Sequence, residues 1–289
     1  NLSPIILKAI KYDLKNSIFS FIPNTAETAF YGLIKGAEDY LNNIKVDRIL
    51  SWGSDIDPEK LTEMINRKVR IEKTAIKDAK LRTFITQDSN RDEMVQHVYD
   101  VTYGTVRKDE DTLIVIDDSI VRGTTLKKSI IRMLSRLKPK RIIVVSSAPQ
   151  IRYPDCYGID MSKLGDFVAF RAAIALIKER GMESLLIDLL LKCKELQRNN
   201  QLHTENMVRQ LYKPFTLDEI SEKIARLITP EEISIPVDVI YQTIETLHES
   251  CPNNKGDWYF TGNYPTPGGN RVCNKAFMNY MEGKNVRGY

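Results

Sequence analysis

Cysteine and histidine are scarce in this sequence of 289 residues, which holds four of the first and three of the second. No CxxC pair is present, and this argues against a disulfide framework and a structural zinc site. The histidines show neither metal-ligand spacing nor a matching nucleophile, so a hydrolase triad has no support. Such sparse thiols fit a reducing compartment, and we expect a cytoplasmic protein. The cysteines are Cys156, Cys193, Cys251 and Cys273.

Long apolar runs and a dominant sign of charge are also missing. No stretch stays apolar for the ~18 residues that a membrane-spanning helix needs. The 42 basic and 38 acidic residues are interspersed along the chain and give a net charge of +4. We therefore expect neither a membrane nor a nucleic acid as a partner, whereas a local anion site is compatible with this composition.

Short apolar runs predict three buried strands, at residues 17–22, 112–116 and 141–149. Helical spacing after these runs predicts crossover helices, and strands that alternate with helices form a mainly parallel sheet. The expected fold class is therefore α/β. In such sheets ligands bind beyond the carboxyl ends of the strands. Three polar turns would share that edge, at residues 23–28, 117–125 and 146–149.

The remaining segments predict a helical extension to this sheet. From about residue 166 the apolar spacing is helical, and the tail from Cys251 is rich in Gly, Asn, Pro and Tyr. We expect an α/β domain over residues 1–180 and a helical extension with a wrapping tail over residues 181–289. Further expected elements are a helix near 1–15, a strand at 45–50, a helix at 57–69, a strand at 69–76 and a long surface excursion after residue 80.

The turn after the strand at 112–116 carries the most specific chemistry. Backbone N–H groups that open a helix form a site for a phosphate monoester, and Gly123 allows close approach of the backbone. Adjacent Asp117 and Asp118 can accept hydrogen bonds from a vicinal diol or hold Mg²⁺. A phosphate beside a diol is a 5-phosphoribosyl group. The alternative is an ordinary capped helix, because Asp and Ser are common N-caps.

The stretch "DDSIVRGTT", residues 117–125, resembles the phosphoribosyl pyrophosphate (PRPP) signature of type I phosphoribosyltransferases. In this full form it resembles the glutamine PRPP amidotransferases. Three further stretches are similar to that family: "SSAPQIRYPDCYGIDM" at 146–161, "LRTFI" at 81–85 and "FTGNYPT" at 260–266. The resemblance implies the type I phosphoribosyltransferase fold with a helical C-terminal extension.

The resemblance also implies roles for individual residues. PRPP would be bound by Asn24, Thr25, Ala26 and Glu27, by Asp117 and Asp118, and by the loop Ser119, Ile120, Val121, Arg122, Gly123, Thr124 and Thr125. Mg²⁺ would be held by Thr25, Asp117 and Asp118, and the nucleotide product would contact Ser147, Ala148 and Pro149. Asp117, Asp118 and Arg82 would be catalytic, with Arg82 as the cation for pyrophosphate. Asn24 departs from the family, in which an acidic residue is usual.

Such an enzyme displaces pyrophosphate from PRPP with ammonia and gives 5-phosphoribosylamine, in the first committed step of purine biosynthesis. The family's full chain begins with a glutaminase domain that makes the ammonia, whereas this sequence starts just before the first expected strand. We therefore expect a truncated chain that uses free ammonia. The resemblance further implies a homo-oligomer that purine nucleotides inhibit. Some members carry an iron–sulfur cluster, but the cysteine spacing here does not offer four ligands, so no cluster is expected.

An acidic lid leaves a second function open. Between residues 88 and 103 the chain has four carboxylates against Arg91 alone, and this sign of charge is wrong for holding pyrophosphate. The alternative is a divergent module that senses PRPP or a nucleotide with little or no turnover. A third possibility, a salvage phosphoribosyltransferase acting on a purine base, lacks a recognisable base-binding hood. Ammonia-dependent release of pyrophosphate separates the first possibility from the other two.

Overall fold

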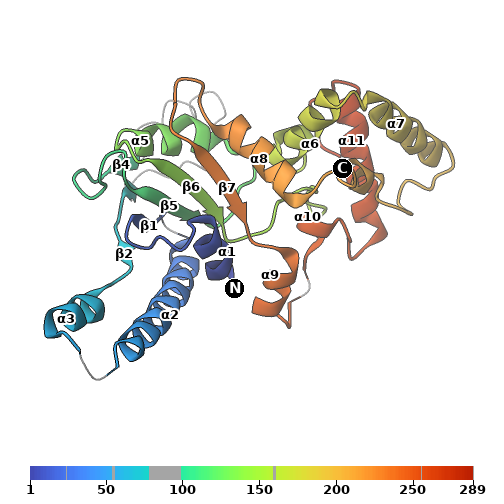
Figure 1. The fold of residues 1–289 in the computed structure, drawn as a ribbon. Coiled ribbons are helices and arrows are strands. Elements are labelled where there is room, and N and C mark those ends of the chain that lie inside the picture. Colours follow the sequence, from blue (N-terminus) through green and yellow to red (C-terminus); the bar gives the residue numbers. More distant parts are fainter. Residues whose placement is uncertain (24, 54–55, 78–98, 159–160, 255, 289) are drawn as a thin grey trace. The chain divides into compact units, whose positions relative to one another are not determined.

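The computed structural model describes residues 1–289 except 24, 54–55, 78–98, 159–160, 255 and 289 (Figure 1). The chain packs as two compact units. Unit 1 comprises Asn1–Asp118, Lys128–Ser147 and Glu231–Ile240, and unit 2 comprises Ser119–Lys127, Ala148–Pro230 and Tyr241–Tyr289. The expected domain boundary at residue 180 stays a prediction.

Unit 1 is built on a five-stranded sheet with the order β2-β1-β5-β6-β7. β1 pairs in parallel with β2 and with β5, and β5 pairs in parallel with β6. The carboxyl ends of these strands therefore lie at one edge of the sheet, as the sequence predicts. The strands are β1 (Ser17–Phe21), β2 (Arg70–Ile71), β5 (Thr112–Asp117), β6 (Arg141–Ser146) and β7 (Val237–Tyr241).

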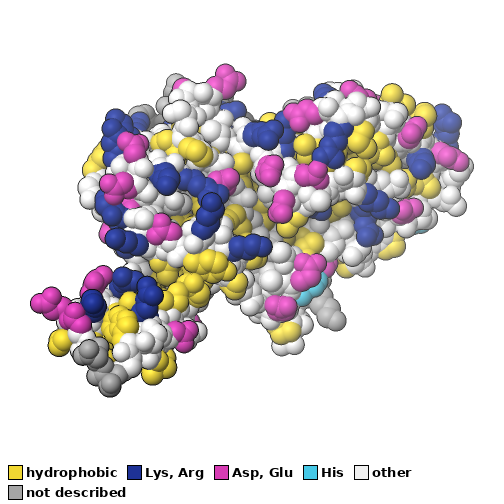
Figure 2. Space-filling view, viewed as in Figure 1, with side chains coloured by type: hydrophobic (Ala, Val, Ile, Leu, Met, Phe, Trp, Pro, Cys, Tyr) yellow, Lys and Arg dark blue, Asp and Glu magenta, His cyan; other side chains and the backbone are white. Residues whose placement is uncertain are grey.

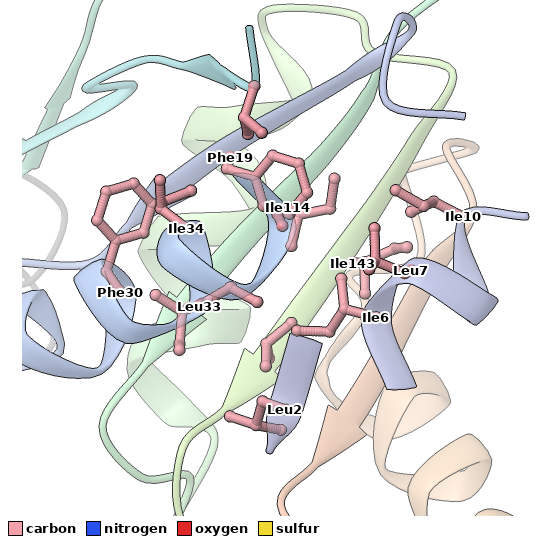
Figure 3. Packing of buried hydrophobic residues seen from close by; sticks show 14 of the residues in the cluster. Leu2, Ile6, Leu7, Ile10, Phe19, Phe30, Leu33, Ile34, Ile114 and Ile143 are labelled. Atoms are coloured by element: carbon pink, nitrogen blue, oxygen red, sulfur yellow. The ribbon is translucent and has the colours of Figure 1, made fainter. Parts of the chain in front are cut away.

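Helices α1 (Leu2–Ala9) and α2 (Glu27–Ser51) pack against this sheet (Figure 3). Ile6 of α1 and Phe30 of α2 meet Ile114 and Ile143 of the central strands in one buried cluster. Side chains of the opposite face of β5 and β6 are buried too, which explains why both strands read as unbroken apolar runs. The other elements of this unit are α3 (Pro58–Asn66), α5 (Ile131–Ser135) and the antiparallel ribbon of β3 (Ala75–Lys77) and β4 (Tyr99–Val101).

The amino end of β5 is fixed by a buried carboxylate, Asp111, which is fully excluded from solvent. Arg70 donates to it from Nη1 at 2.6 Å, and Arg107 donates from Nη2 at 2.6 Å and from its backbone N–H at 2.7 Å. Burial alone would raise the pKa of Asp111, but these hydrogen bonds outweigh burial and lower the pKa to about 2. Asp111 thus joins the segment of residues 107–111 to Arg70, which lies 41 residues away in sequence.

Unit 2 is mainly helical, and this confirms the expected helical extension. Its core includes Phe167, Phe170 and Phe277, all fully buried. The expected helices at its centre are present as α6 (Val168–Glu179), α7 (Glu183–Arg198) and α8 (Leu217–Ile228). The remaining elements are η1 (Leu126–Ile130), which the two units share, η2 (Leu164–Asp166), η3 (Met207–Leu211), α9 (Ile244–Ser250), α10 (Trp258–Thr261) and α11 (Pro267–Met281).

Three expectations about individual elements differ from the structure. The strand expected at 45–50 is the last part of the 25-residue helix α2, because Val46 and Leu50 are apolar residues of a continuing, solvent-exposed helical turn. The strand β7 was not expected. The tail after Cys251 does more than wrap the domain, since α11 buries Val272 and Phe277 in the core of unit 2.

The α/β class is confirmed as a mainly parallel sheet flanked by helices. Among the described residues, no helix is both long enough and apolar enough to cross a membrane. Figure 2 shows basic and acidic side chains interspersed over the visible face, in agreement with the balanced charge of the sequence.

Candidate functional site

Asp117 and Asp118 end the central strand β5 at the edge where ligands bind in parallel sheets. Ser147, the first residue after the neighbouring strand β6, contacts the backbone of both. The backbone N–H of Ser147 donates to the Asp117 carbonyl at 2.9 Å, and its Oγ donates to the Asp118 carbonyl at 3.0 Å. The backbone beneath both carboxylates is therefore fixed from one side.

The turn after β1 reaches the same carboxylates from the other side. Ile22 N–H donates to the Ile116 carbonyl at 2.8 Å, and the Thr25 hydroxyl donates to Oδ2 of Asp118. Thr25 is exposed and Asp118 is half-buried. The structure thus brings together four of the residues that the sequence predicts as site residues: Thr25, Asp117, Asp118 and Ser147.

The other predicted residues of the β1 turn have different surroundings. Ala26 is fully buried in the core, so only its backbone can serve a ligand. Glu27 begins α2 and accepts a hydrogen bond from the Tyr31 hydroxyl at 3.1 Å. Asn24 and Arg82 lie outside the described residues.

The two neighbouring carboxylates make this edge electrostatically unusual. Burial at the end of the strand raises the pKa of Asp117 to about 7, and the negative charge of Asp118 contributes in the same direction. The Asp118 N–H donates to Asp117 Oδ1 at 2.9 Å and offsets part of this rise. A divalent cation would relieve the repulsion between the carboxylates.

The donor set fits Mg²⁺ bound together with a substrate. Two carboxylates and the Thr25 hydroxyl offer the hard oxygen atoms that Mg²⁺ prefers. No group of three or more His, Cys, Asp or Glu in the described part of the chain could hold a metal ion by itself. Mg²⁺ commonly binds to one or two carboxylates and completes its shell with water and substrate phosphates, which suits this arrangement.

The loop after Asp118 belongs to unit 2 and contains a glycine in the left-handed region of the backbone. Gly123 has φ +69, and a Cβ there would lie 2.7 Å from Cγ2 of Ile228, so glycine is required for both conformation and space. Lys127 N–H donates to the Gly123 carbonyl at 3.0 Å as the helix η1 opens. Thr124 and Thr125 are exposed, whereas Ile120 is buried and anchors the loop.

Residues at the start of α6 hold this loop by hydrogen bonds, and no sequence pattern pointed to them. Val168 N–H donates to the Val121 carbonyl at 2.8 Å, and Nη2 of Arg171 donates to the Arg122 carbonyl at 2.6 Å. The side chain of Arg122 forms an ion pair with Asp166 at 3.6 Å. Arg122 can therefore serve a ligand through its backbone while its side chain contacts Asp166.

The three residues that the resemblance assigns to nucleotide contact directly follow β6. Ser147 and Ala148 are half-buried, and Pro149 is buried.

The four cysteines carry free thiols, of which Cys193 and Cys273 are buried. Burial raises the pKa of the Cys193 thiol to about 12, which makes it a poor thiolate.

A mainly parallel sheet, an acidic pair at the end of a central strand and a glycine-containing turn before a helix are the features expected from the resemblance to type I phosphoribosyltransferases. Comparison with known proteins agrees with this class. The chain is similar in sequence to amidophosphoribosyltransferases, which confirms the resemblance read from its motifs.

The similarity covers part of each protein. The amidophosphoribosyltransferase of Haemophilus influenzae is 40% identical over 95 residues, which are 32% of this chain and 18% of the relative. The enzyme of Saccharomyces cerevisiae is 27% identical over 158 residues, 53% of this chain and 20% of the relative. The chain thus matches about a fifth of these relatives' length. No protein-family model matches the chain.

A solved structure is similar to a larger share of the chain. It is the glutamine PRPP amidotransferase from B. subtilis complexed with ADP and GMP. The match covers 87% of this chain and 38% of the B. subtilis chain, with 19% identity and a TM-score of 0.43.

Proposed function

We propose that this chain performs the phosphoribosyltransferase reaction of a glutamine PRPP amidotransferase. Ammonia displaces pyrophosphate from C1 of PRPP and gives 5-phosphoribosylamine. The observation that carries this proposal is the acidic pair Asp117–Asp118, bridged to Thr25 and Ser147 and followed directly by the phosphate loop. The sequence similarity to amidophosphoribosyltransferases supports the same reaction.

Each part of PRPP has matching chemistry in these residues. The carboxylates of Asp117 and Asp118 can accept hydrogen bonds from the ribose 2- and 3-hydroxyls. The N–H groups of the loop from Ser119 to Thr125 suit the 5-phosphate, because a turn that opens a helix carries partial positive charge. The turn that contains Thr25 suits the pyrophosphate. By the family resemblance, Ser147, Ala148 and Pro149 would contact the nucleotide product.

Bond cleavage at C1 builds positive charge on the ribose and negative charge on the leaving pyrophosphate. Asp117 and Asp118 would stabilise the first, and Mg²⁺ bound by Thr25, Asp117 and Asp118 would neutralise the second. These groups are preorganised, since hydrogen bonds from Thr25 and Ser147 already fix Asp118. The role of Arg82 as a further cation for pyrophosphate stays a prediction.

The test is release of pyrophosphate from PRPP with Mg²⁺ at alkaline pH, with and without ammonium chloride. We expect ammonia-dependent release by the wild type and its loss, by at least about 100-fold, in the double variant Asp117→Asn, Asp118→Asn. Asp39→Asn is the matched control, because Asp39 is an exposed carboxylate of unit 1 on α2. Ammonia-independent binding of PRPP without release would overturn the proposal and leave the sensing module.

Other properties follow from the family resemblance and are proposed with the reaction. We expect a homo-oligomer, inhibition by purine nucleotides, and ammonia supplied from glutamine by a glutaminase domain. The free thiols of all four cysteines support a reducing compartment such as the cytoplasm.

A further inference from the structure

The phosphate loop can bind an anion only if its N–H groups point toward the ligand. In a planar trans peptide the carbonyl of one residue and the N–H of the next point in opposite directions. The carbonyl of Val121 therefore fixes the N–H of Arg122, and the carbonyl of Arg122 fixes the N–H of Gly123. Whatever holds these two carbonyls determines where the two donors point.

Both carbonyls are held by the first turn of α6, in the same compact unit as the loop. Val168 holds the first through its backbone N–H at 2.8 Å. Arg171 holds the second through its guanidinium at 2.6 Å. The Val168 bond survives most substitutions because it involves only the backbone, whereas the Arg171 bond depends on the side chain.

The charge of Arg171 suits this role. Arg171 is solvent-exposed as a residue, but partial burial of its guanidinium lowers its pKa, and nearby Asp166 acts in the opposite direction. Asp166 also pairs with the Arg122 side chain at 3.6 Å. The Arg122 side chain is thus engaged by Asp166, while Arg171 contacts the loop backbone directly. A guanidinium at the Arg122 carbonyl polarises that peptide and makes the Gly123 N–H a stronger donor.

We infer that Arg171 is a positioning residue for the phosphate loop, which orients and polarises the Gly123 N–H toward the 5-phosphate of a phosphoribosyl ligand. This inference rests on the proposed function for the identity of the ligand. The phosphate is bound equally before and during the reaction at C1. Loss of Arg171 should therefore raise KM for PRPP and leave kcat nearly unchanged.

Arg171→Met and Arg171→Gln both remove the contact, because neither side chain carries a donor that reaches as far as the arginine Nη2. We expect each to weaken binding of ribose 5-phosphate, measured by calorimetry, about fivefold, the size of one exposed charge-assisted hydrogen bond. KM for PRPP should rise by a similar factor. Arg180→Met is the control, since Arg180 pairs with Glu219 and lies over Phe215 in the same unit. It should bind within twofold of the wild type.

Two results separate this inference from the proposed function. Wild-type affinity for ribose 5-phosphate in both Arg171 variants would overturn the role of Arg171, even if the wild type releases pyrophosphate with ammonia. A fall in kcat with KM unchanged would overturn it as well. Fivefold weaker binding in the variants, together with a wild type that releases no pyrophosphate with ammonia, would support the role of Arg171 and overturn the proposed reaction.

Discussion

The two ends of strand β5 carry acidic residues with opposite surroundings. At the amino end Asp111 is fully buried and accepts hydrogen bonds from two arginines, which lower its pKa to about 2. At the carboxyl end Asp117 adjoins Asp118, and burial with this second negative charge raises the pKa of Asp117 to about 7. Strand β5 thus follows a carboxylate that stabilises the fold and ends in a carboxylate that costs stability. Such local cost is typical of functional sites.

Replacing Asp111, the stabilising carboxylate at the amino end of β5, should have the largest effect on stability. We expect Asp111→Asn to lower the free energy of unfolding by about 3 kcal/mol, because Arg70 and Arg107 lose a buried counter-charge. Urea denaturation measures this change. Asp109→Asn is the control, since the Asp109 side chain is 73% exposed and should change stability by less than ~0.5 kcal/mol. Equal effects of the two variants would contradict the contrast.

The same carboxylate should make stability depend on acid. The pKa of Asp111 is about 2 in the folded chain against an ordinary 3.8, so its contribution is present above pH ~4 and is lost as pH falls toward 2. Its size is about 2 kcal/mol. We expect the loss in urea titrations of the wild type from pH 5 to pH 2 and a smaller loss in Asp111→Asn. Identical pH profiles for the two proteins would exclude this role of Asp111.

The contrast between residues that stabilise the fold and residues of the proposed site extends to the phosphate loop, residues 119–125, in unit 2. Gly123→Ala places a methyl group 2.7 Å from Cγ2 of Ile228 at φ +69. We expect a loss of roughly 1–2 kcal/mol of unfolding free energy together with weaker binding of ribose 5-phosphate. Gly181→Ala is the control, since it has φ +63 with open space around the added Cβ. It should cost about 1 kcal/mol and leave ligand binding intact.

Thr25 should have the smallest effect on stability. Thr25→Val keeps the shape of an exposed side chain and removes the hydroxyl that donates to Asp118. We expect unfolding free energy to stay within ~0.5 kcal/mol of the wild type, while kcat/KM for PRPP falls about tenfold. A loss of stability without a loss of activity would show that the contact between Thr25 and Asp118 stabilises the fold and does not serve the proposed site.

The sequence predicts the edge of the sheet that carries the proposed site better than it predicts pairings between distant segments. Strands β5 and β6 are continuous apolar runs, and the residues of the carboxylate pair follow directly in sequence, so local pattern suffices for both. β7 is a short strand that pairs with β6, although the two are far apart in the sequence. No local pattern specifies this pairing.

The partners of Asp111 and of the phosphate loop could not be predicted either, because they also lie far away in the sequence. Asp111 depends on Arg70, which lies 41 residues away, and the phosphate loop depends on Arg171, which lies 49 residues from Arg122. Isolated charges of this kind read as solvated surface groups until the fold brings their partners near. An acidic residue directly before a buried apolar strand, as Asp111 is, offers the one usable signal.

One variant tests the comparison most directly. Asp117→Asn removes a charge that burial and Asp118 both disfavour, yet it also removes a carboxylate of the proposed site. At pH 8 in the presence of EDTA we expect Tm to rise by about 3 °C, corresponding to about 1 kcal/mol. Ammonia-dependent release of pyrophosphate with Mg²⁺ should fall at least about 100-fold in the same variant. A lower Tm, or release that persists at the wild-type rate, would contradict the assignment of this end of β5 to function.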